Sequence, residues 1–359
     1  MSEGRFRVLV LADSRAFHTE RYVLQMRRQG CHILLASFER GTTHHHHLKR
    51  QGFVRRLHYG LGALEIRRIV KRFRPDVINP HYISGYGFAA ALAKAQKHAP
   101  LFMHLWGSDV LLVPGMSGLH RYKVAYTLKR ANFVCADSEY LLNAARGISK
   151  FSCRTGVIPW GLEERFLELH KKDYALHKPL RILVPRSHEK VYGNLFIVQA
   201  LAQLIVEDRV RLTFPKSGTR CGQFLERARS LVGDRIHLYE KLSRQDFMQL
   251  MAQHDVYLSN AASDSSPVSM IEAMGLGLIP VAADIPGVRE WLGEQKGFRY
   301  KPGTPEQLTE VVVRLLDSND PLQQLRQRNL DLVRSKAIFE NNVAETIAIM
   351  RDLAAKRTT

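Results

Sequence analysis

Two carboxylates flank the predicted start of a helix in LSNAASDSSPVSMIEAMGLGLIPVAADIPGVREWL, residues 258–292. A strand is predicted to end at Ser259, and Asp264 lies in the polar loop that follows it. Glu272 comes eight residues after Asp264, inside the predicted helix. At a rise of about 1.5 Å per helical residue, the two carboxylates are expected about 12 Å apart. Carboxylates at that spacing suit a ligand that presents hydroxyl groups at both of its ends.

The start of this helix is a candidate anion site. Pro267 suits the first helical turn, because that position needs no backbone N–H. The amides of Val268 and Ser269 would then be free to bind a diphosphate, which the positive end of the helix dipole attracts. A capped helix with a solvated aspartate and an ordinary glutamate explains the same residues about equally well.

Two cations lie in a loop after another predicted strand, in LVPRSHEKVYGNLFIVQA, residues 183–200. Arg186 and Lys190 follow that strand and precede a helix. A guanidinium and an ammonium at the mouth of a parallel strand suit the charge of a diphosphate. Loops are often basic, so these residues gain weight only together with the other motifs.

The elements that must position these side chains alternate between strands and helices along the whole chain. Short apolar runs predict strands, and segments with helical spacing fall between them. This alternation predicts an α/β fold with parallel sheets covered on both faces, and two series of strands predict two domains. The predicted strands are 5–12, 31–37, 76–79, 101–106 and 132–136, then 181–185, 210–214, 235–238, 255–259 and 278–282.

The domain boundary is predicted within Val157–Lys178, where VIPWGLEERF leads into a charged stretch. Pro159 and Gly161 interrupt regular structure there. We therefore assign residues 1–161 to one domain, 162–338 to a second, and 339–359 to a final helix.

The composition excludes several classes of protein. Of the 359 residues, 45% are hydrophobic and 24% are charged, which is typical of a globular protein. The four cysteines lie far apart, which argues against a disulfide scaffold or a zinc ribbon and fits a reducing cytoplasm. No apolar run is long enough to span a bilayer, and the first residues lack the features of a signal peptide. No metal site is predicted.

The positive charge is concentrated in the first half. Residues 1–161 carry 25 basic and nine acidic side chains, whereas residues 162–359 carry 28 and 25. This asymmetry indicates an anionic partner for the first domain: a membrane surface, a phosphorylated acceptor or a nucleic acid. Ala63–Arg74 is predicted to be a basic amphipathic helix packed on the sheet. Its basic face suits an anionic membrane surface, and simple solvation of its arginines explains it about equally well. The candidate membrane-surface residues are Arg67, Arg68, Lys71 and Arg72.

Together these motifs resemble those of the GT-B glycosyltransferases of the large retaining family called family 4, or glycosyl transferases group 1. The pair Asp264 and Glu272 is similar to that family's E-x7-E motif, and EAMGLGLIPVAADIPGVRE is similar to the segment that ends it. PRSHEKVYGN resembles the family's diphosphate loop, VIPWGLEERF its interdomain segment, and MHLWGSDVL its N-terminal HG.D segment. The matches occur in the family's order along nearly the whole chain.

The resemblance implies two Rossmann-like domains that face a central cleft, with the C-terminal helix crossing back onto the first domain. Residues 1–161 would form the acceptor-side domain, and residues 162–338 would form the domain that binds the nucleotide sugar. It implies a retaining, metal-independent hexosyltransferase that uses a UDP- or GDP-sugar and no cofactor. Arg186 and Lys190 would stabilise the leaving diphosphate. Asp264, one methylene shorter than the family's glutamate, would contact the donor sugar, and Glu272 would hold the ribose. The helix start at Pro267, Val268 and Ser269 would bind the diphosphate.

The first domain departs from the family pattern. Judged by its spacing from Asp109, Trp106 stands where the family has a histidine. His104 lies two residues earlier, on the same face of a predicted strand, and either supplies the missing imidazole or is a core histidine. The first strand–helix loop, ADSRAFHTER, lacks the family's paired glycines. Ser14, near the leaving phosphate, is a further donor-binding candidate. The acceptor-side candidates are His18, His81, Trp106 and Asp109.

Three other functions compete with this interpretation. Gly85-Tyr86-Gly87-Phe88-Ala89-Ala90 matches the dinucleotide motif G-x-G-x-x-A, but it falls in a later strand–helix unit, where close helix packing explains it as well. A nucleic-acid binder would use the basic half, yet no recognised nucleic-acid motif occurs, so no nucleic-acid partner is predicted. A non-catalytic GT-B subunit would lose Arg186, Lys190 or Glu272, all of which are present.

We therefore predict a cytoplasmic glycosyltransferase, peripheral on the inner face of the cytoplasmic membrane. It would build a cell-envelope polysaccharide or glycolipid, such as lipopolysaccharide, on a lipid-linked or oligosaccharide acceptor.

Overall fold

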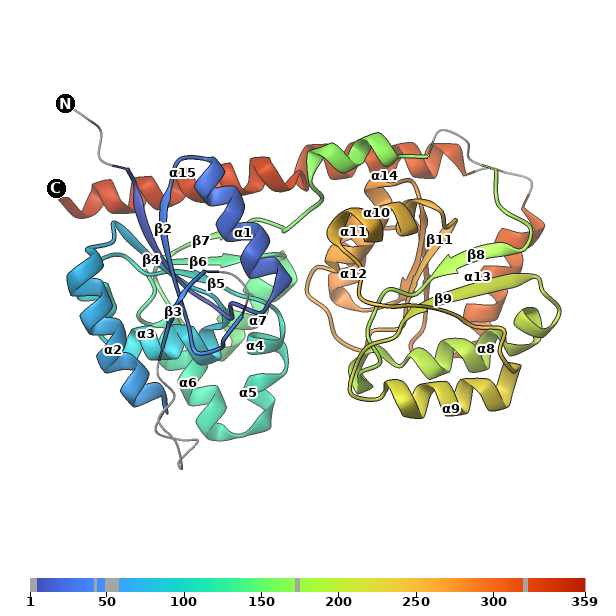
Figure 1. Cartoon of the computed structure of the whole chain (residues 1–359), viewed down its shortest axis with the longest axis horizontal. Coiled ribbons are helices and arrows are strands. Elements are labelled where there is room, and N and C mark those ends of the chain that lie inside the picture. Colours follow the sequence, from blue (N-terminus) through green and yellow to red (C-terminus); the bar gives the residue numbers. More distant parts are fainter. Residues whose placement is uncertain (1–4, 42–43, 49–57, 172–174, 319–321, 359) are drawn as a thin grey trace. The chain divides into compact units, whose positions relative to one another are not determined.

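The chain divides into two compact units, each built on a parallel sheet. The computed structural model describes residues 5–41, 44–48, 58–171, 175–318 and 322–358. Unit 1 comprises residues 1–159 and 340–359, and unit 2 comprises residues 160–339 (Figure 1). The predicted boundaries, after residues 161 and 338, lie beside these divisions, and the roles assigned to the domains stay predictions.

The described strands of unit 1 form two parallel sheets, which are joined edge to edge between β4 and β5. Four strands are ordered β3-β2-β1-β4 and three are ordered β5-β6-β7. Parallel bridges from Ile78 to Leu101 and from His81 to His104 join β4 to β5. The order of the chain reverses between β1 and β4, which run in parallel register side by side. The strands are β1 (Arg7–Leu11), β2 (His32–Ser37), β3 (His46–His47), β4 (Val77–Pro80), β5 (Phe102–His104), β6 (Phe133–Ala136) and β7 (Arg154–Val157).

Helices cover both faces of this sheet. The helices α3 and α6, which follow β4 and β5 along the chain, pack against each other, and α3 also packs against α2. The chain's last helix, α15, lies beside α1, since the Gln29 amide donates to the carbonyl of Glu340 over 2.8 Å (Figure 1). These helices are α1 (Phe17–Arg28), α2 (His58–Phe73), α3 (Phe88–Leu92), α4 (Ser108–Leu111), α5 (Val113–Met116), α6 (Gly118–Leu128), α7 (Glu139–Ile148) and α15 (Phe339–Thr358).

Unit 2 has a single parallel sheet of six strands. Its order is β10-β9-β8-β11-β12-β13, so the order in which successive strands are added reverses between β8 and β11. In open α/β sheets, ligands bind at the carboxyl ends of the strands where the order reverses. The strands are β8 (Leu180–Leu183), β9 (Val210–Pro215), β10 (His237–Tyr239), β11 (Val256–Ser259), β12 (Ile279–Ala283) and β13 (Phe298–Tyr300).

The helices of unit 2 bury apolar side chains on both faces of the sheet. One core cluster includes Ile182, Ile197 and Phe214, and another includes Leu183, Tyr257 and Met270. The helices are α8 (Asn194–Val206), α9 (Cys221–Val232), α10 (Arg244–Ala252), α11 (Val268–Gly275), α12 (Pro286–Leu292), α13 (Pro305–Asp317) and α14 (Gln323–Lys336).

All ten predicted strands form, with ends displaced by a few residues. The sequence missed β3, β7 and β13, each of which is the edge strand of its sheet. Edge strands are short and partly solvated, so they lack the apolar run that marks a buried parallel strand. Within the described residues, no helix has the length and apolar character needed to cross a membrane.

Candidate active site

Arg186 and Asp264 meet where the strand order of unit 2 reverses. Arg186 lies in the loop after β8 and Asp264 in the loop after β11, and their side chains form an ion pair. Only 19% of the Arg186 side chain and 15% of the Asp264 side chain are exposed. The guanidinium carbon also lies 4.6 Å from the ring centre of Tyr192. The sequence predicted both residues but not their pairing, which joins loops 78 residues apart.

Asn194 and His188 stabilise the loop that carries Arg186 through hydrogen bonds. The Asn194 amide donates to the Arg186 carbonyl over 2.8 Å and lies 3.1 Å from Nδ1 of His188. His188 Nε2 donates to the carbonyl of Pro215 over 2.9 Å, and its ring stacks on Phe224 with 3.8 Å between ring centres. Burial lowers the pKa of His188, so the ring is neutral at pH 7. The sequence analysis missed this support, because no motif marks it.

Arg186 and Lys190 line two neighbouring hollows. A pocket of about 440 Å³ is lined by Arg186, Tyr192, Lys216, Tyr239 and Phe247, at the carboxyl ends of β8, β9 and β10. Lys190 lines a smaller pocket of about 170 Å³ with Arg220 and Arg227. Both pockets carry basic side chains, and the larger one adds aromatic rings.

Glu272 is bound to a second ion-pair network, which the sequence did not predict. Its Oε1 lies 2.6 Å from Nη2 of Arg244, and the same nitrogen lies 2.6 Å from Oε2 of Glu163. The exposed side-chain fractions are 4% for Glu272, 13% for Arg244 and 10% for Glu163. Two carboxylates therefore share one buried guanidinium, which orients Glu272.

The predicted helix start at Pro267 forms as expected. Pro267 is the N-cap of α11, and Val268 and Ser269 occupy its first turn. The Ser269 hydroxyl lies 3.1 Å from that of Tyr257. A side chain at Gly287 would approach the Asp264 carbonyl oxygen to 2.4 Å, so the start of α12 packs directly against this loop.

In unit 1, Asn79 links three ring-bearing residues at the ends of β4 and β5. Its Oδ1 accepts from the Tyr22 hydroxyl over 3.0 Å and from Nε2 of His81 over 3.1 Å. Its Nδ2 donates to the carbonyl of Phe102 over 2.8 Å and to Nδ1 of His104 over 3.1 Å. Burial lowers the pKa of His104 to about 3 and, with the neighbouring His104, lowers the pKa of His81. Both rings are therefore neutral, and His104 has the surroundings of a core histidine.

Trp106 lies among aromatic rings beside this network. It stacks on Tyr82 with 5.2 Å between ring centres, and its centre lies 5.3 Å from His81 and 5.7 Å from His18. Tyr82 has a φ of 58°, in the left-handed region. Such strain is concentrated at ligand sites, and together with the stacking on Trp106 it makes Tyr82 a candidate site residue that the sequence analysis missed.

Asp109 supports this cluster from inside the protein. It is fully buried, and its two carboxylate oxygens accept from the backbone N–H groups of Ile83 over 2.9 Å and Trp106 over 3.0 Å. Burial raises its pKa to about 6. Asp109 therefore fixes the backbone beside Trp106 and Tyr82 and does not face solvent.

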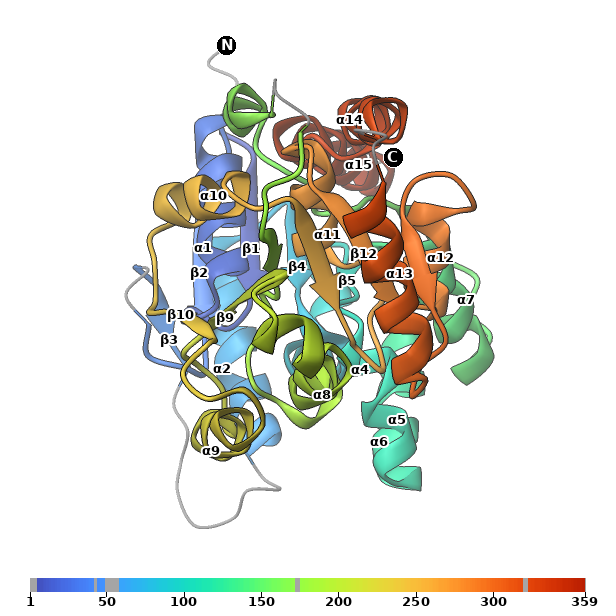
Figure 2. The same ribbon diagram turned by 90° about the vertical axis from the view of Figure 1, so that its right-hand side faces the viewer.

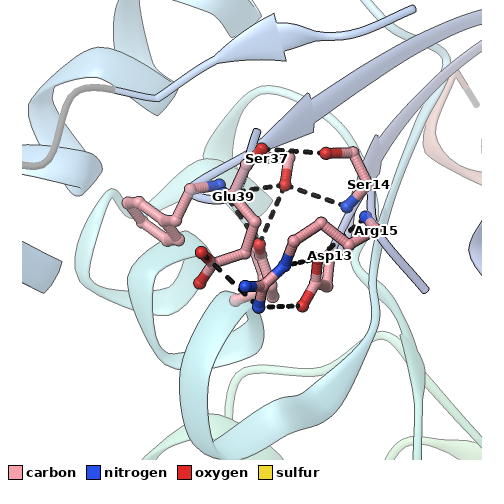
Figure 3. Close-up of polar contacts among 7 residues, drawn as sticks. Asp13, Ser14, Arg15, Ser37 and Glu39 are labelled. Atoms are coloured by element: carbon pink, nitrogen blue, oxygen red, sulfur yellow. Dashed lines mark hydrogen bonds and ion pairs between the residues drawn. The ribbon is translucent and has the colours of Figure 1, made fainter. Parts of the chain in front are cut away.

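Ser14 is buried too, and its hydroxyl and backbone N–H both form hydrogen bonds within the protein (Figure 3). Its hydroxyl donates to the carbonyl of Glu39 over 2.8 Å, and its backbone N–H donates to the Ser37 hydroxyl over 3.0 Å. The Arg15 side chain donates two hydrogen bonds to Asp13 and approaches Glu39 to 3.6 Å. The sequence did not predict this polar group, which ties the loop after β1 to the loop after β2.

The basic face of α2 is only partly free. The Arg67 guanidinium donates to the carbonyl of Ala93 over 2.7 Å, which anchors α2 to the neighbouring α3 region. Arg68, Lys71 and Arg72 are exposed.

The G-x-G-x-x-A segment has a packing role. It begins in a π-helical turn, Tyr82–Gly87, that continues into α3. A side chain at Gly87 would approach Thr127 of α6 to 3.1 Å, so the glycine permits close contact between these helices.

Two family models match the chain, one in each unit. Residues 7–138 match "Glycosyl transferase 4-like" and residues 169–330 match "Glycosyl transferases group 1". The two matches together cover well over half of the chain. The chain belongs to the GT-B glycosyltransferases.

Three known proteins resemble this glycosyltransferase, one in sequence and two in fold. TuaC of Bacillus subtilis, named as a teichuronic acid biosynthesis glycosyltransferase, is 22% identical over 246 residues, which make up 67% of this chain and 61% of TuaC. Sucrose-phosphate synthase from Thermosynechococcus elongatus superposes with a TM-score of 0.81 and 14% identity over 98% of this chain and all of that one. Anabaena HepE in complex with UDP-glucose has a TM-score of 0.76 and 18% identity over 95% and 99% of the chains.

Proposed function

We propose that this glycosyltransferase transfers a sugar from a nucleotide sugar, a UDP- or GDP-sugar, to an acceptor used in cell-envelope glycan synthesis. The ion pair of Arg186 and Asp264 at the strand reversal of unit 2 carries the proposal, because it puts a cation and a carboxylate beside a pocket of about 440 Å³. The HepE complex with UDP-glucose supports a donor of this class, and TuaC supports an envelope acceptor.

The donor would bind to unit 2 through its charged and hydroxyl groups. Arg186 would leave Asp264 to pair with the donor diphosphate, and Asp264 would then accept from a hydroxyl of the sugar. The helix start at Pro267, Val268 and Ser269 would add backbone donors for the diphosphate. Glu272, oriented by Arg244, would accept from the ribose hydroxyls.

Arg186 and Lys190 would stabilise the negative charge that grows on the leaving diphosphate, without a metal ion. We infer retention of the anomeric configuration: the acceptor oxygen forms its bond to the anomeric carbon on the face that the diphosphate leaves, and the leaving phosphate takes the acceptor's proton.

The acceptor would bind to unit 1, at the edge of the sheet that carries His18 and Trp106. Tyr82 would belong to the same surface, because its ring stacks on Trp106. His81, Asp109 and His104 would position these rings from below, since all three are buried. The exposed cations of α2 would hold the enzyme on the anionic inner face of the cytoplasmic membrane, near a lipid-linked or oligosaccharide acceptor.

The test is a double substitution, Arg186→Ala with Lys190→Ala, against thermal-shift binding of UDP and GDP in the presence of EDTA. The wild type should be stabilised by one of these nucleotides, and the variant should lose the shift while keeping its own melting transition. Arg229→Ala with Arg211→Ala is the matched control, because both side chains form exposed ion pairs in the same unit and line neither pocket. A variant that still binds the nucleotide and turns over the donor would show that the site assignment is wrong.

The alternatives give different results in the same panel. A dinucleotide enzyme would be stabilised by NAD and not by a nucleoside diphosphate, and a non-catalytic subunit would respond to neither ligand.

A further inference from the structure

The projecting end of unit 1 carries an unusual group of exposed apolar side chains. We call Leu112, Met116, Leu119 and Tyr122 the apolar tip. Their exposed fractions are 46%, 70%, 55% and 60%, and Met116 and Tyr122 are the two most exposed large apolar side chains among the described residues. All four fall within eleven consecutive residues. Exposed apolar groups that cluster in this way mark an interaction surface.

The apolar tip lies on short helices and on the turns between them. The helices α4 and α5 have four residues each, and Ser117 separates α5 from α6, whose start it caps by accepting from the His120 N–H. The inner side of α6 is anchored in the core through Val124, Thr127 and Leu128, which are buried. Both views show α5 and α6 projecting from the body of unit 1 (Figures 1 and 2).

The charge around the tip favours a lipid surface. Residues 110–136 contain no aspartate or glutamate, and Arg121 and Lys129 of this segment are exposed. The exposed cations of α2 belong to the same layer, because α3 packs against both α2 and α6. An apolar surface with basic flanks fits the boundary between anionic head groups and acyl chains. A second copy of the chain is a poor partner, since the same basic side chains would face each other.

We propose that the apolar tip inserts into an anionic lipid bilayer while the flanking cations bind its head groups. Leu112 lies only six residues after Trp106, so insertion would bring the bilayer surface to the edge of the sheet where the acceptor is expected. The identity of the acceptor rests on the proposed function, whereas vesicle binding requires no turnover.

The experiment combines sedimentation with an insertion probe. The full chain is mixed with vesicles of phosphatidylglycerol and phosphatidylcholine, or of phosphatidylcholine alone. Met116→Ser with Leu119→Ser should weaken binding to the anionic vesicles about tenfold or more, because half-exposed apolar groups no longer leave water. Val206→Ser with Leu231→Ser, exposed apolar positions of unit 2, should leave binding unchanged.

The probe is an environment-sensitive dye on Met116→Cys, in a chain whose partly exposed Cys153 and Cys221 are replaced by serine. Its emission should shift to the blue with anionic vesicles, and a dye at Leu231→Cys should not respond. Unchanged sedimentation of the double serine variant, or no shift of the Met116 dye, would refute insertion. A shift that appears without vesicles and grows with protein concentration would identify a second copy as the partner and overturn the proposal. Nucleotide binding measured without vesicles reports the donor site separately, so either proposal can fail alone.

Discussion

The buried network of Glu163, Arg244 and Glu272 makes a sharp prediction about stability. One nitrogen of Arg244 lies 2.6 Å from an oxygen of each glutamate, so these two oxygens lie within about 5 Å of each other. Arg244→Met keeps the length of the side chain and removes its charge. Two nearly buried carboxylates would then face each other.

The expected loss is about 3 kcal/mol of unfolding free energy at neutral pH. Two unit charges about 5 Å apart repel by about 3 kcal/mol at an effective dielectric constant of about 20, and breaking one partner of a buried ion pair costs about 3–5 kcal/mol. The loss should shrink in acid. Between about pH 4 and pH 6 the folded variant would hold a proton between the two carboxyls that the unfolded chain has released, so stability falls as the pH rises through this range.

A second substitution tests the cause. In Arg244→Met with Glu163→Gln the repulsion is gone, so the double variant should be more stable than Arg244→Met alone at about pH 8, by about 2 kcal/mol. Glu163→Gln alone leaves the pair of Arg244 and Glu272 intact and should cost about 1 kcal/mol.

The assay is urea unfolding followed by tryptophan fluorescence, with Trp106→Phe as the common background. Trp160 and Trp291, both buried in unit 2, then report the unit that contains the network. A loss that is equal at about pH 5 and about pH 8, or a double variant no more stable than Arg244→Met, would refute the electrostatic reasoning and leave packing as the cause.

Three further outcomes are expected. Asp264→Asn should raise the affinity for UDP severalfold in calorimetry while lowering turnover of the donor, because Arg186 no longer leaves a carboxylate when it binds the diphosphate; unchanged UDP affinity would show that the ion pair does not compete with the ligand. His104→Gln should flatten the pH dependence of unit 1 stability, since the wild-type ring, with its pKa lowered to about 3, stays neutral when folded, whereas the unfolded chain takes up a proton below about pH 6.5. The wild type should therefore lose about 2 kcal/mol of unfolding free energy between about pH 6.5 and pH 5, and the variant should not. The same change of unfolding free energy with pH in both proteins would contradict this. Asp109→Asn should cost about 1–3 kcal/mol, because an amide turns one N–H donor toward the backbone N–H of Ile83 or Trp106; an unchanged midpoint would show that these bonds are dispensable. Both unit 1 variants are followed by the fluorescence of Trp106, with Trp160 and Trp291 replaced by phenylalanine, because Trp106 lies in unit 1.

The fold was largely predictable from the sequence, because the signals for strands and helix starts lie within short segments of the chain. Runs such as those of β1 and β11 are buried on both faces, so they are apolar throughout and stand out along the chain. The edge strands β3, β7 and β13 lack this signal. Pro267 and the residues after it also marked the start of α11 correctly, because the first turn of a helix has its own residue preferences.

For the candidate site, the sequence predicted several of the residues but not the residues that they contact. Arg186, Asp264 and Glu272 were found because their spacing within loops and helices is a property of the chain. Their partners were not found: Asp264 for Arg186, Arg244 and Glu163 for Glu272, Asn79 for His81 and His104. Apart from the contact of Asn79 with His81, which are two residues apart, each of these contacts joins residues that are distant in sequence.

The sequence by itself determined which elements form, their order and which side chains lie at the ends of strands, since these follow from hydrophobic periodicity and turn chemistry. Only the tertiary structure decided how those side chains are used. It buries His104 and Asp109, joins Arg186 to Asp264, engages Ser14 internally and exposes the apolar tip on α4–α6. Burial and partnership depend on which elements pack together, and the strand order that sets this packing is a property of the whole chain.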